Sequence, residues 1–213
     1  MNVYRRMFLT VIFAAVTVIT SSAGAASFEV TPFAGYTMGG EFSNAETGQP
    51  LSLNDTSSYG IMLDFKQAMD SKQPGTAWIE LYFSSQQTKL KADQGAFAGS
   101  PSLDVNIEYY HVGGTYGQSE GTVQPFVVGT LGATHMVPKG AGFESETKPS
   151  LSLGGGVKLY LTEHIGLRFD ARWFGTLVSS NGGMFCSNGA CLVKVQGDLF
   201  SQYAANAGLI LAF

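Results

Sequence analysis

The sequence has few charged residues and, beyond its N-terminal segment, no long apolar run. Charged side chains make up 13% of the chain, about half of the ~25% usual in soluble domains. After residue 25, no stretch approaches the ~18 consecutive apolar residues of a membrane-spanning helix. The chain therefore lacks both the charge of an ordinary soluble protein and a helical span.

Basic residues are also scarce, with 12 Lys and Arg against 16 Asp and Glu, a formal net charge of −4. Arg5 and Arg6 belong to the N-terminal segment, so the remainder has 12 − 2 = 10 basic residues and a net charge of 10 − 16 = −6. A protein that binds nucleic acid needs a basic surface to neutralise phosphates. We therefore expect no nucleic acid partner.

The N-terminal segment predicts a secretory signal peptide. Two arginines precede an apolar run at 7–19, and Ala23-Gly24-Ala25 forms an A-x-A cleavage signal. The apolar run has 13 residues, which is short for a helical span of about 20. We expect residues 1–25 to be removed and residues 26–213 to form the mature domain.

The mature sequence alternates between apolar and polar residues in eight segments, which predicts eight β-strands. In the clearest segment, Ile165, Leu167 and Phe169 alternate with Arg168 and Asp170. Successive strand residues point to opposite faces, so one face is apolar and the other carries charge. An even number of strands suits closure of an antiparallel barrel. The expected strands lie at 28–37, 59–66, 77–84, 103–110, 123–137, 151–161, 165–177 and 202–213.

The connections between these segments alternate in length. Long connections are expected at 39–55, 88–101, 138–148 and 179–198, and shorter ones at 67–75, 117–121 and 162–164. Outer-membrane barrels have short periplasmic turns and longer outer loops. We therefore expect both termini to lie in the periplasm.

Alternation alone leaves open which face is inside, because a soluble eight-stranded barrel of the lipocalin type would be apolar within. The polar face here is rich in Ser, Thr, Asn, Gln, Gly and Tyr and has few Lys. Such a face suits a packed polar lumen, and aromatic residues on the apolar face fall near strand ends, where membrane girdles lie. We therefore predict an all-β, eight-stranded antiparallel up-and-down transmembrane β-barrel. The expected periplasmic girdle is Phe28, Phe65, Tyr109 and Phe213, and the outer girdle is Tyr36, Tyr59, Phe83, Trp173 and Tyr203.

The last strand places Tyr203, Leu209, Leu211 and the final Phe213 on its apolar face. With the signal peptide and eight alternating strands, the sequence resembles the small outer-membrane barrels grouped with OmpA, OmpX and the opacity-type porin family. The resemblance covers the whole mature chain and rests on pattern, without a diagnostic internal motif. It implies that these four residues form the signal read by the barrel-assembly machinery of a Gram-negative outer membrane. We expect no anchoring to the cell wall, because no peptidoglycan-binding domain follows the barrel.

Charged residues on the polar face predict a network inside the barrel. An eight-stranded barrel is just wide enough for side chains to fill, and a charge buried there must pair or stay hydrated. We expect Arg168 and Arg172 to pair with Glu80 and Glu108, because an Arg fork suits a carboxylate. The network is either a salt-bridged plug or a narrow, gated polar pore. Its expected core is Glu80, Glu108, Lys158, Arg168, Asp170 and Arg172, with Glu29, Asp64, Lys66 and Asp104 also facing inward.

The two cysteines, Cys186 and Cys191, lie in the longest expected loop with Asn188-Gly189 between them. Asn-Gly favours a tight reversal that brings its flanks together, and the export route is oxidising. We therefore predict a disulfide between them. Metal binding by this pair is not expected, because no His or second Cys pair is near in sequence.

Three histidines were considered as catalytic groups. None of His111, His135 and His164 is followed by Ser two positions later, so the His-x-Ser-Asn segment of outer-membrane lipid A deacylases is absent. His135 could lie near the outer rim with Glu144 or Glu146, but omptin-type proteases have ten strands. We expect His111 to face lipid and His164 to be solvated. The sequence predicts no catalytic residue, cofactor or metal.

The preferred function is therefore that of a non-enzymatic integral outer-membrane protein, structural or surface-interactive through its extracellular loops. We expect a monomer in contact with outer-membrane lipid, lipopolysaccharide and the barrel-assembly machinery. The alternative is a narrow passive, porin-like channel for small solutes, and the third possibility is a lipid A-modifying enzyme.

Overall fold

The structure is a computed structural model that describes residues 27–44, 50–68, 75–91, 102–118, 120–139, 144–178, 183–187, 190–196 and 199–213. Within these ranges, no helix is long and apolar enough to cross a membrane. The strands are β1 (Phe28–Met38), β2 (Glu41–Asn44), β3 (Pro50–Leu53), β4 (Thr56–Lys66), β5 (Thr76–Lys91), β6 (Ser102–Gly117), β7 (Val123–Pro138), β8 (Glu146–Tyr160), β9 (Ile165–Leu177), β10 (Gly183–Ser187), β11 (Ala190–Gln196) and β12 (Leu199–Ala212).

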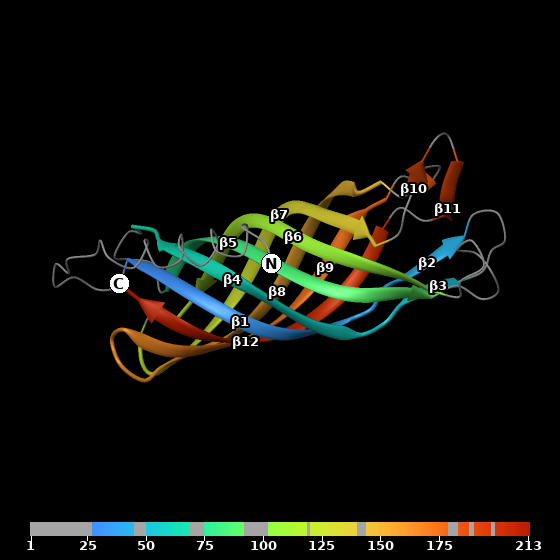
Figure 1. The fold of residues 1–213 in the computed structure, drawn as a ribbon. Coiled ribbons are helices and arrows are strands. Elements are labelled where there is room, and N and C mark those ends of the chain that lie inside the picture. Colours follow the sequence, from blue (N-terminus) through green and yellow to red (C-terminus); the bar gives the residue numbers. More distant parts are fainter. Residues whose placement is uncertain are drawn as a thin grey trace, which may run out of the picture.

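Eight long strands close into an antiparallel barrel (Figure 1). Around the ring their order is β1, β4, β5, β6, β7, β8, β9 and β12, and pairing of β12 with β1 completes it. Each barrel strand therefore pairs with the barrel strands that precede and follow it along the chain, as in an up-and-down barrel. The predicted closed eight-stranded antiparallel barrel is confirmed.

Four short strands at one end of the barrel were not predicted. The hairpin of β2 and β3 lies in the first long connection, and the hairpin of β10 and β11 lies in the last. β3 pairs with β5 and β11 pairs with β2, so both hairpins extend the barrel sheet. Figure 1 shows them at the end opposite the C-terminus. We name this the loop end, and the end that contains Phe28 and Phe213 the terminal end.

The predicted alternation holds along most of the barrel. Leu131, for example, is 68% exposed on the outer face while its neighbour Thr130 is buried in the lumen. At the terminal end, the Phe28 ring lies 4.9 Å from that of Phe65 and 6.3 Å from that of Phe213, measured between centroids. The outer face is therefore apolar, and aromatic side chains lie at its terminal edge as predicted.

Strand β6 differs from the prediction in the direction of its side chains. Ile107 and Tyr109 are buried inside the barrel, whereas Asp104 and Glu108 face outward. The sequence predicts the opposite arrangement, with the apolar residues of this strand facing outward as they do on the other strands. Tyr109 consequently does not belong to the periplasmic girdle.

The physical reason is that the barrel reverses its polarity along its axis. β5, β6 and β7 each have 16 residues, whereas about 9–11 suffice to cross a membrane. On β5, the outer positions change from exposed Leu81 near the middle to Gln87 and Lys89 at the loop end, while the inner positions change from Glu80 to Leu90. Along β5 and β6, the loop end is therefore polar outside and apolar inside, like a soluble barrel.

Candidate functional site

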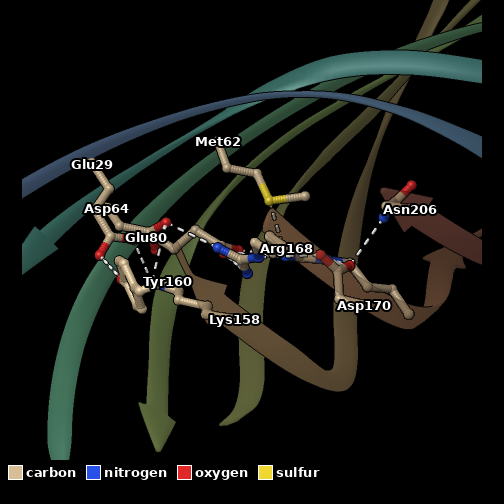
Figure 2. A network of polar contacts seen from close by, with 10 residues as sticks. Glu29, Met62, Asp64, Glu80, Lys158, Tyr160, Arg168, Asp170 and Asn206 are labelled. Atoms are coloured by element: carbon tan, nitrogen blue, oxygen red, sulfur yellow. Dashed lines mark hydrogen bonds and ion pairs between the residues drawn. The ribbon is translucent and has the colours of Figure 1, made fainter. Parts of the chain in front are cut away.

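A buried cluster of seven charged side chains lies in the terminal half of the lumen (Figure 2). Antiparallel register places Glu29, Asp64 and Glu80 side by side on β1, β4 and β5. β8 and β9 supply the remaining charges from their inward positions. We name the set the lumen cluster; its members are Glu29, Asp64, Glu80, Lys158, Arg168, Asp170 and Arg172.

Glu80 is the carboxylate that both arginines share. Its Oε2 accepts from Arg168 Nη2 at 2.6 Å and from Arg172 Nη2 at 3.1 Å, and its Oε1 accepts from Arg172 Nη1 at 2.7 Å. The contact with Arg172 is bidentate, the strongest geometry for such a pair. The predicted pairing of the two arginines with an inward glutamate is thus present at Glu80.

Asp170 joins the two arginines from their own strand. Its Oδ2 accepts from Arg168 Nε at 3.2 Å and its Oδ1 from Arg172 Nε at 2.8 Å. Asn206 Nδ2 on β12 donates a further hydrogen bond to Asp170 Oδ1 at 3.0 Å. Asp64 Oδ2 accepts from Arg168 Nη1 at 2.9 Å. Each arginine is therefore held by at least two carboxylates.

The cluster continues toward the terminal end through Glu29. Lys158 Nζ donates to Glu29 Oε2 at 2.5 Å, and the Tyr160 hydroxyl donates to Glu29 Oε1. The Lys158 ammonium also lies 4.6 Å from the centroid of the Trp78 ring, within the range of a cation–π contact. Three strands, β1, β5 and β8, thus contribute to the part of the cluster nearest the terminal end, and Figure 2 shows its polar members Glu29, Lys158 and Tyr160.

Glycines on β8 leave the space that the β9 side chains occupy. A Cβ placed on Gly156 would lie 2.7 Å from Asp170 Cβ and 2.1 Å from the Phe169 carbonyl oxygen. One placed on Gly154 would lie 3.1 Å from Arg172 Cα. The Gly-Gly-Gly run at 154–156 was a sequence signal for this close packing that the alternation pattern did not reveal.

A layer of aromatic and neutral polar side chains lies above the cluster. Tyr109 stacks on Phe174 with centroids 4.3 Å apart, and its hydroxyl donates to Gln202 Oε1 at 2.5 Å. His111 contacts the Thr130 hydroxyl through Nδ1 at 2.9 Å. His111 is therefore a buried, hydrogen-bonded lumen residue, and its predicted lipid-facing position is wrong because β6 faces the other way.

A third, apolar layer fills the loop end of the lumen. Leu90, Leu103, Val105 and Met136 are buried there and belong to the same apolar cluster as Phe200. Side chains therefore occupy the lumen at three heights: the charged cluster, the aromatic layer and this apolar layer. An eight-stranded barrel is just wide enough for such filling, so a solute could pass only if these layers rearranged.

Two charged residues expected in the lumen, Glu108 and Asp104, lie on the outer face. Glu108 faces outward, where it accepts hydrogen bonds from Asn106 Nδ2 at 2.8 Å and from the Tyr110 hydroxyl at 2.7 Å. Asp104 also faces outward. Lys66 keeps the inward register of β4 but lies exposed at the terminal end, with its Nζ 5.9 Å from the centroid of the Trp78 ring. The predicted pairing of the arginines with Glu108 is therefore wrong, whereas Glu29 and Asp64 do join the cluster.

The predicted disulfide and the predicted barrel-assembly signal both stay predictions. Register places the backbone of Cys186 opposite that of Cys191 across the β10–β11 hairpin, but the side chains there lie outside the described residues. Tyr203, Leu209 and Phe213 share the exposed outer face of β12, with half-buried Leu211 between them.

The other two histidines lie outside the lumen. The His135 ring bonds the Thr147 hydroxyl through Nδ1 at 2.8 Å. His164 is exposed in the turn between β8 and β9. Over the described ranges, no group of three or more His, Cys, Asp or Glu residues could hold a metal ion.

The chain was also compared with known proteins. No protein-family model and no curated protein sequence matches it. Among solved structures it is similar to Neisserial surface protein A (NspA), with a TM-score of 0.55 and 18% identity over 89% of this chain and 99% of that one. It is also similar to the outer membrane protein OprG from Pseudomonas aeruginosa, with a TM-score of 0.50 and 13% identity over 89% of this chain and 96% of that one. The chain therefore has the closed eight-stranded fold of the small outer-membrane β-barrels.

Proposed function

We propose that the chain is a non-enzymatic, non-conducting integral outer-membrane protein that acts through the surface of its loop end. The observation that carries this proposal is the filled lumen. Glu80 fixes two buried arginines with three contacts of 2.6–3.1 Å, and apolar side chains such as Ile107 and Met136 lie above them. A lumen filled in this way favours a non-conducting structural protein over a channel.

The proposed orientation places the loop end outside the cell and the terminal end in the periplasm. The projecting parts of β5, β6 and β7, together with the two hairpins, support it, because outer-membrane barrels carry their longer connections outside. In the same proposal, residues 1–25 are a signal peptide, and Tyr203, Leu209, Leu211 and Phe213 are read by the barrel-assembly machinery. The protein would act as a monomer.

A narrow passive channel is the main competing function. Conduction would require Arg168 and Arg172 to release Glu80 and the apolar layer to open. Planar-bilayer recording of the refolded protein separates the two functions, because a scaffold gives no reproducible conductance steps. Regular steps from the wild-type protein would contradict the proposal.

The variant Arg172→Ala tests whether the lumen cluster holds the barrel together. Removal of the Arg172 guanidinium leaves Glu80 and Asp170 each without one partner, so the thermal stability of the barrel is expected to fall. If both thermal stability and conductance stay at wild-type values, the lumen cluster has neither role. Glu108→Gln serves as the matched control, because Glu108 lies outside the lumen.

An activity on lipid A is the third possibility, and lipid mass spectrometry of a deletion strain tests it. We expect the lipid A species of the deletion strain to match those of the parent. A lipid A species that disappears from the deletion strain and returns on complementation would replace the scaffold proposal with an enzymatic one.

A further inference from the structure

The outer face of β5 and β6 carries a polar surface at the loop end. We name it the polar flank. It lies on the side of the barrel, and Lys139, which directly follows β7, adds to it. The polar flank comprises Gln87, Lys89, Asp104, Asn106, Glu108 and Lys139.

Below the polar flank, the same strands carry an apolar band edged by aromatic side chains. Register places Leu81, Val112 and Leu131 side by side, and they are 40%, 53% and 68% exposed on the outer face. One step toward the loop end, the rings of Phe83 and Tyr110 lie 5.1 Å apart between centroids. Aromatic side chains of this kind mark the level of the lipid headgroups.

The polar flank begins directly at this aromatic edge. The Tyr110 hydroxyl donates to Glu108 Oε2 at 2.7 Å, and Asn106 Nδ2 donates to Glu108 Oε1 at 2.8 Å. These contacts connect the aromatic edge to a row of amide and carboxylate groups. Amides and carboxylates are the usual hydrogen-bond partners of hydroxyl groups, so this level suits sugars.

Lysines form the upper part of the polar flank, around Asp104. Lys89 Nζ lies 3.3 Å from Asp104 Oδ1, and both side chains are more than half exposed. Lys139 Nζ donates to Gln87 Oε1 at 2.9 Å, and the Lys139 backbone N–H donates to the Asp104 carbonyl at 2.7 Å. Exposed Lys91, also on β5, adds a third cation next to the polar flank. This upper part is therefore cationic, although residues 26–213 have a net charge of −6 (10 basic against 16 acidic residues).

On the opposite side of the barrel, the described outer positions at the loop end of β9, β12 and β1 carry no charged side chain. Toward the loop end of β9, β12 and β1, the outer positions hold Leu177, Leu199 and Met38, which are 49%, 45% and 46% exposed. Among the described residues, the charged outer positions at this height thus gather on β5, β6 and the end of β7, which points to a partner on that side.

The position of the polar flank identifies the kind of partner. Outward side chains project sideways from the barrel, so their partner lies beside it in the leaflet. Lys89 is six residues beyond Phe83 on β5, which is about 14 Å of height at ~3.3 Å per residue and ~45° tilt. A partner that spans this height has acyl chains beside the apolar band, sugars above them and negative charge near the lysines.

We propose that the polar flank binds a phosphorylated glycolipid of the lipopolysaccharide class. Its acyl chains lie on the apolar band, its sugars contact Asn106 and Glu108, and its phosphates lie at Lys89 and Lys139. This inference rests on the proposed function, because that function places the loop end outside the cell, where this lipid class is found.

The test measures binding of lipopolysaccharide to the detergent-solubilised, folded wild-type barrel and to the double variant Lys89→Gln/Lys139→Gln. A lysine near an anionic lipid surface contributes about a factor of five in affinity, so the double variant is expected to bind on the order of thirtyfold more weakly. Lys66→Gln is the matched control, because Lys66 is exposed at the terminal end. Dephosphorylated lipopolysaccharide should bind the wild type as weakly as the phosphorylated form binds the double variant.

Equal affinity of the wild type and the double variant would overturn the proposal. So would equal affinity of the wild type for lipopolysaccharide and for phosphatidylglycerol, or binding of a soluble sulfated polysaccharide without binding of the glycolipid. Failure of the proposed function has a different signature: the wild type would give conductance steps in a planar bilayer, whatever its affinity for the glycolipid.

Discussion

Replacing Glu80 with glutamine removes the carboxylate that two buried arginines share. Arg172 then keeps Asp170 as its only carboxylate, and the new amide group points N–H donors at a guanidinium. Removing one partner of a buried ion pair costs about 3–5 kcal/mol. We therefore expect the free energy of unfolding of Glu80→Gln to fall by about 4 kcal/mol.

Two further variants distinguish the loss of ion pairs from the change in formal charge. Asp64→Asn changes the formal charge of the lumen cluster by the same amount. Asp64, however, contacts only one arginine, at 2.9 Å, and Lys158 at 3.9 Å, and its Oδ1 has no hydrogen-bond partner among the described residues. The loss of a hydrogen bond to a charged group costs about 2 kcal/mol. Glu108→Gln, at a partly exposed outer position, should change stability by no more than about 0.5 kcal/mol.

The assay is urea unfolding of the barrel refolded into lipid vesicles, followed by tryptophan fluorescence. Both tryptophans, Trp78 and Trp173, lie on barrel strands, and linear extrapolation gives the free energy of unfolding. The expected order of loss is Glu80→Gln, then Asp64→Asn, then Glu108→Gln. A Glu80→Gln barrel no less stable than Asp64→Asn would refute the role of pairing, because total charge alone predicts equal effects.

Two more predictions concern the packing of β8 and the loop-end hairpin. Gly156→Ala should cost about 1–3 kcal/mol because its Cβ would overlap the Asp170 side chain, whereas Gly129→Ala meets only a side-chain methyl at 3.5 Å and should be nearly neutral in the same urea assay. Equal stability of these two alanine variants would contradict the close packing. A thiol-alkylation assay without reductant should label neither Cys186 nor Cys191, and two labelled thiols would exclude the disulfide.

Much of the fold follows from side-chain alternation, and the exceptions have a physical cause. The side-chain directions on β9 were predicted correctly, because Arg168 and Arg172 lie in the lumen while Phe169 faces outward. This is the arrangement that a polar lumen and an apolar exterior require. β6 was misread because its outer positions change from Glu108 to Tyr110 where the strand leaves the apolar band. The strand was expected to end at residue 110, whereas β6 continues to Gly117.

The sequence predicts most of the charged residues of the lumen cluster, but it predicts their ion pairs less well. Inward charges on regular strands made a lumen network expected, and Glu80 does meet both arginines. Which carboxylate they would meet could not be read from the sequence, because contacts across the lumen depend on strand tilt and stagger. Glu29 and Asp64 lie beside Glu80 through strand register and belong to the cluster, whereas Glu108 faces outward on β6. The hairpins of β2–β3 and β10–β11 were missed because short strands inside polar, Gly-rich connections give little alternation.

The central claim is that this chain forms a closed barrel in the outer membrane, held by its lumen cluster. Heat-modifiable gel migration tests it most directly, on protein taken from an outer-membrane fraction without boiling and after boiling. A barrel held by buried ion pairs and a continuous ring of strand pairing should resist the detergent at room temperature and change its mobility only after heating. Identical mobility of the unboiled and boiled samples would contradict the claim.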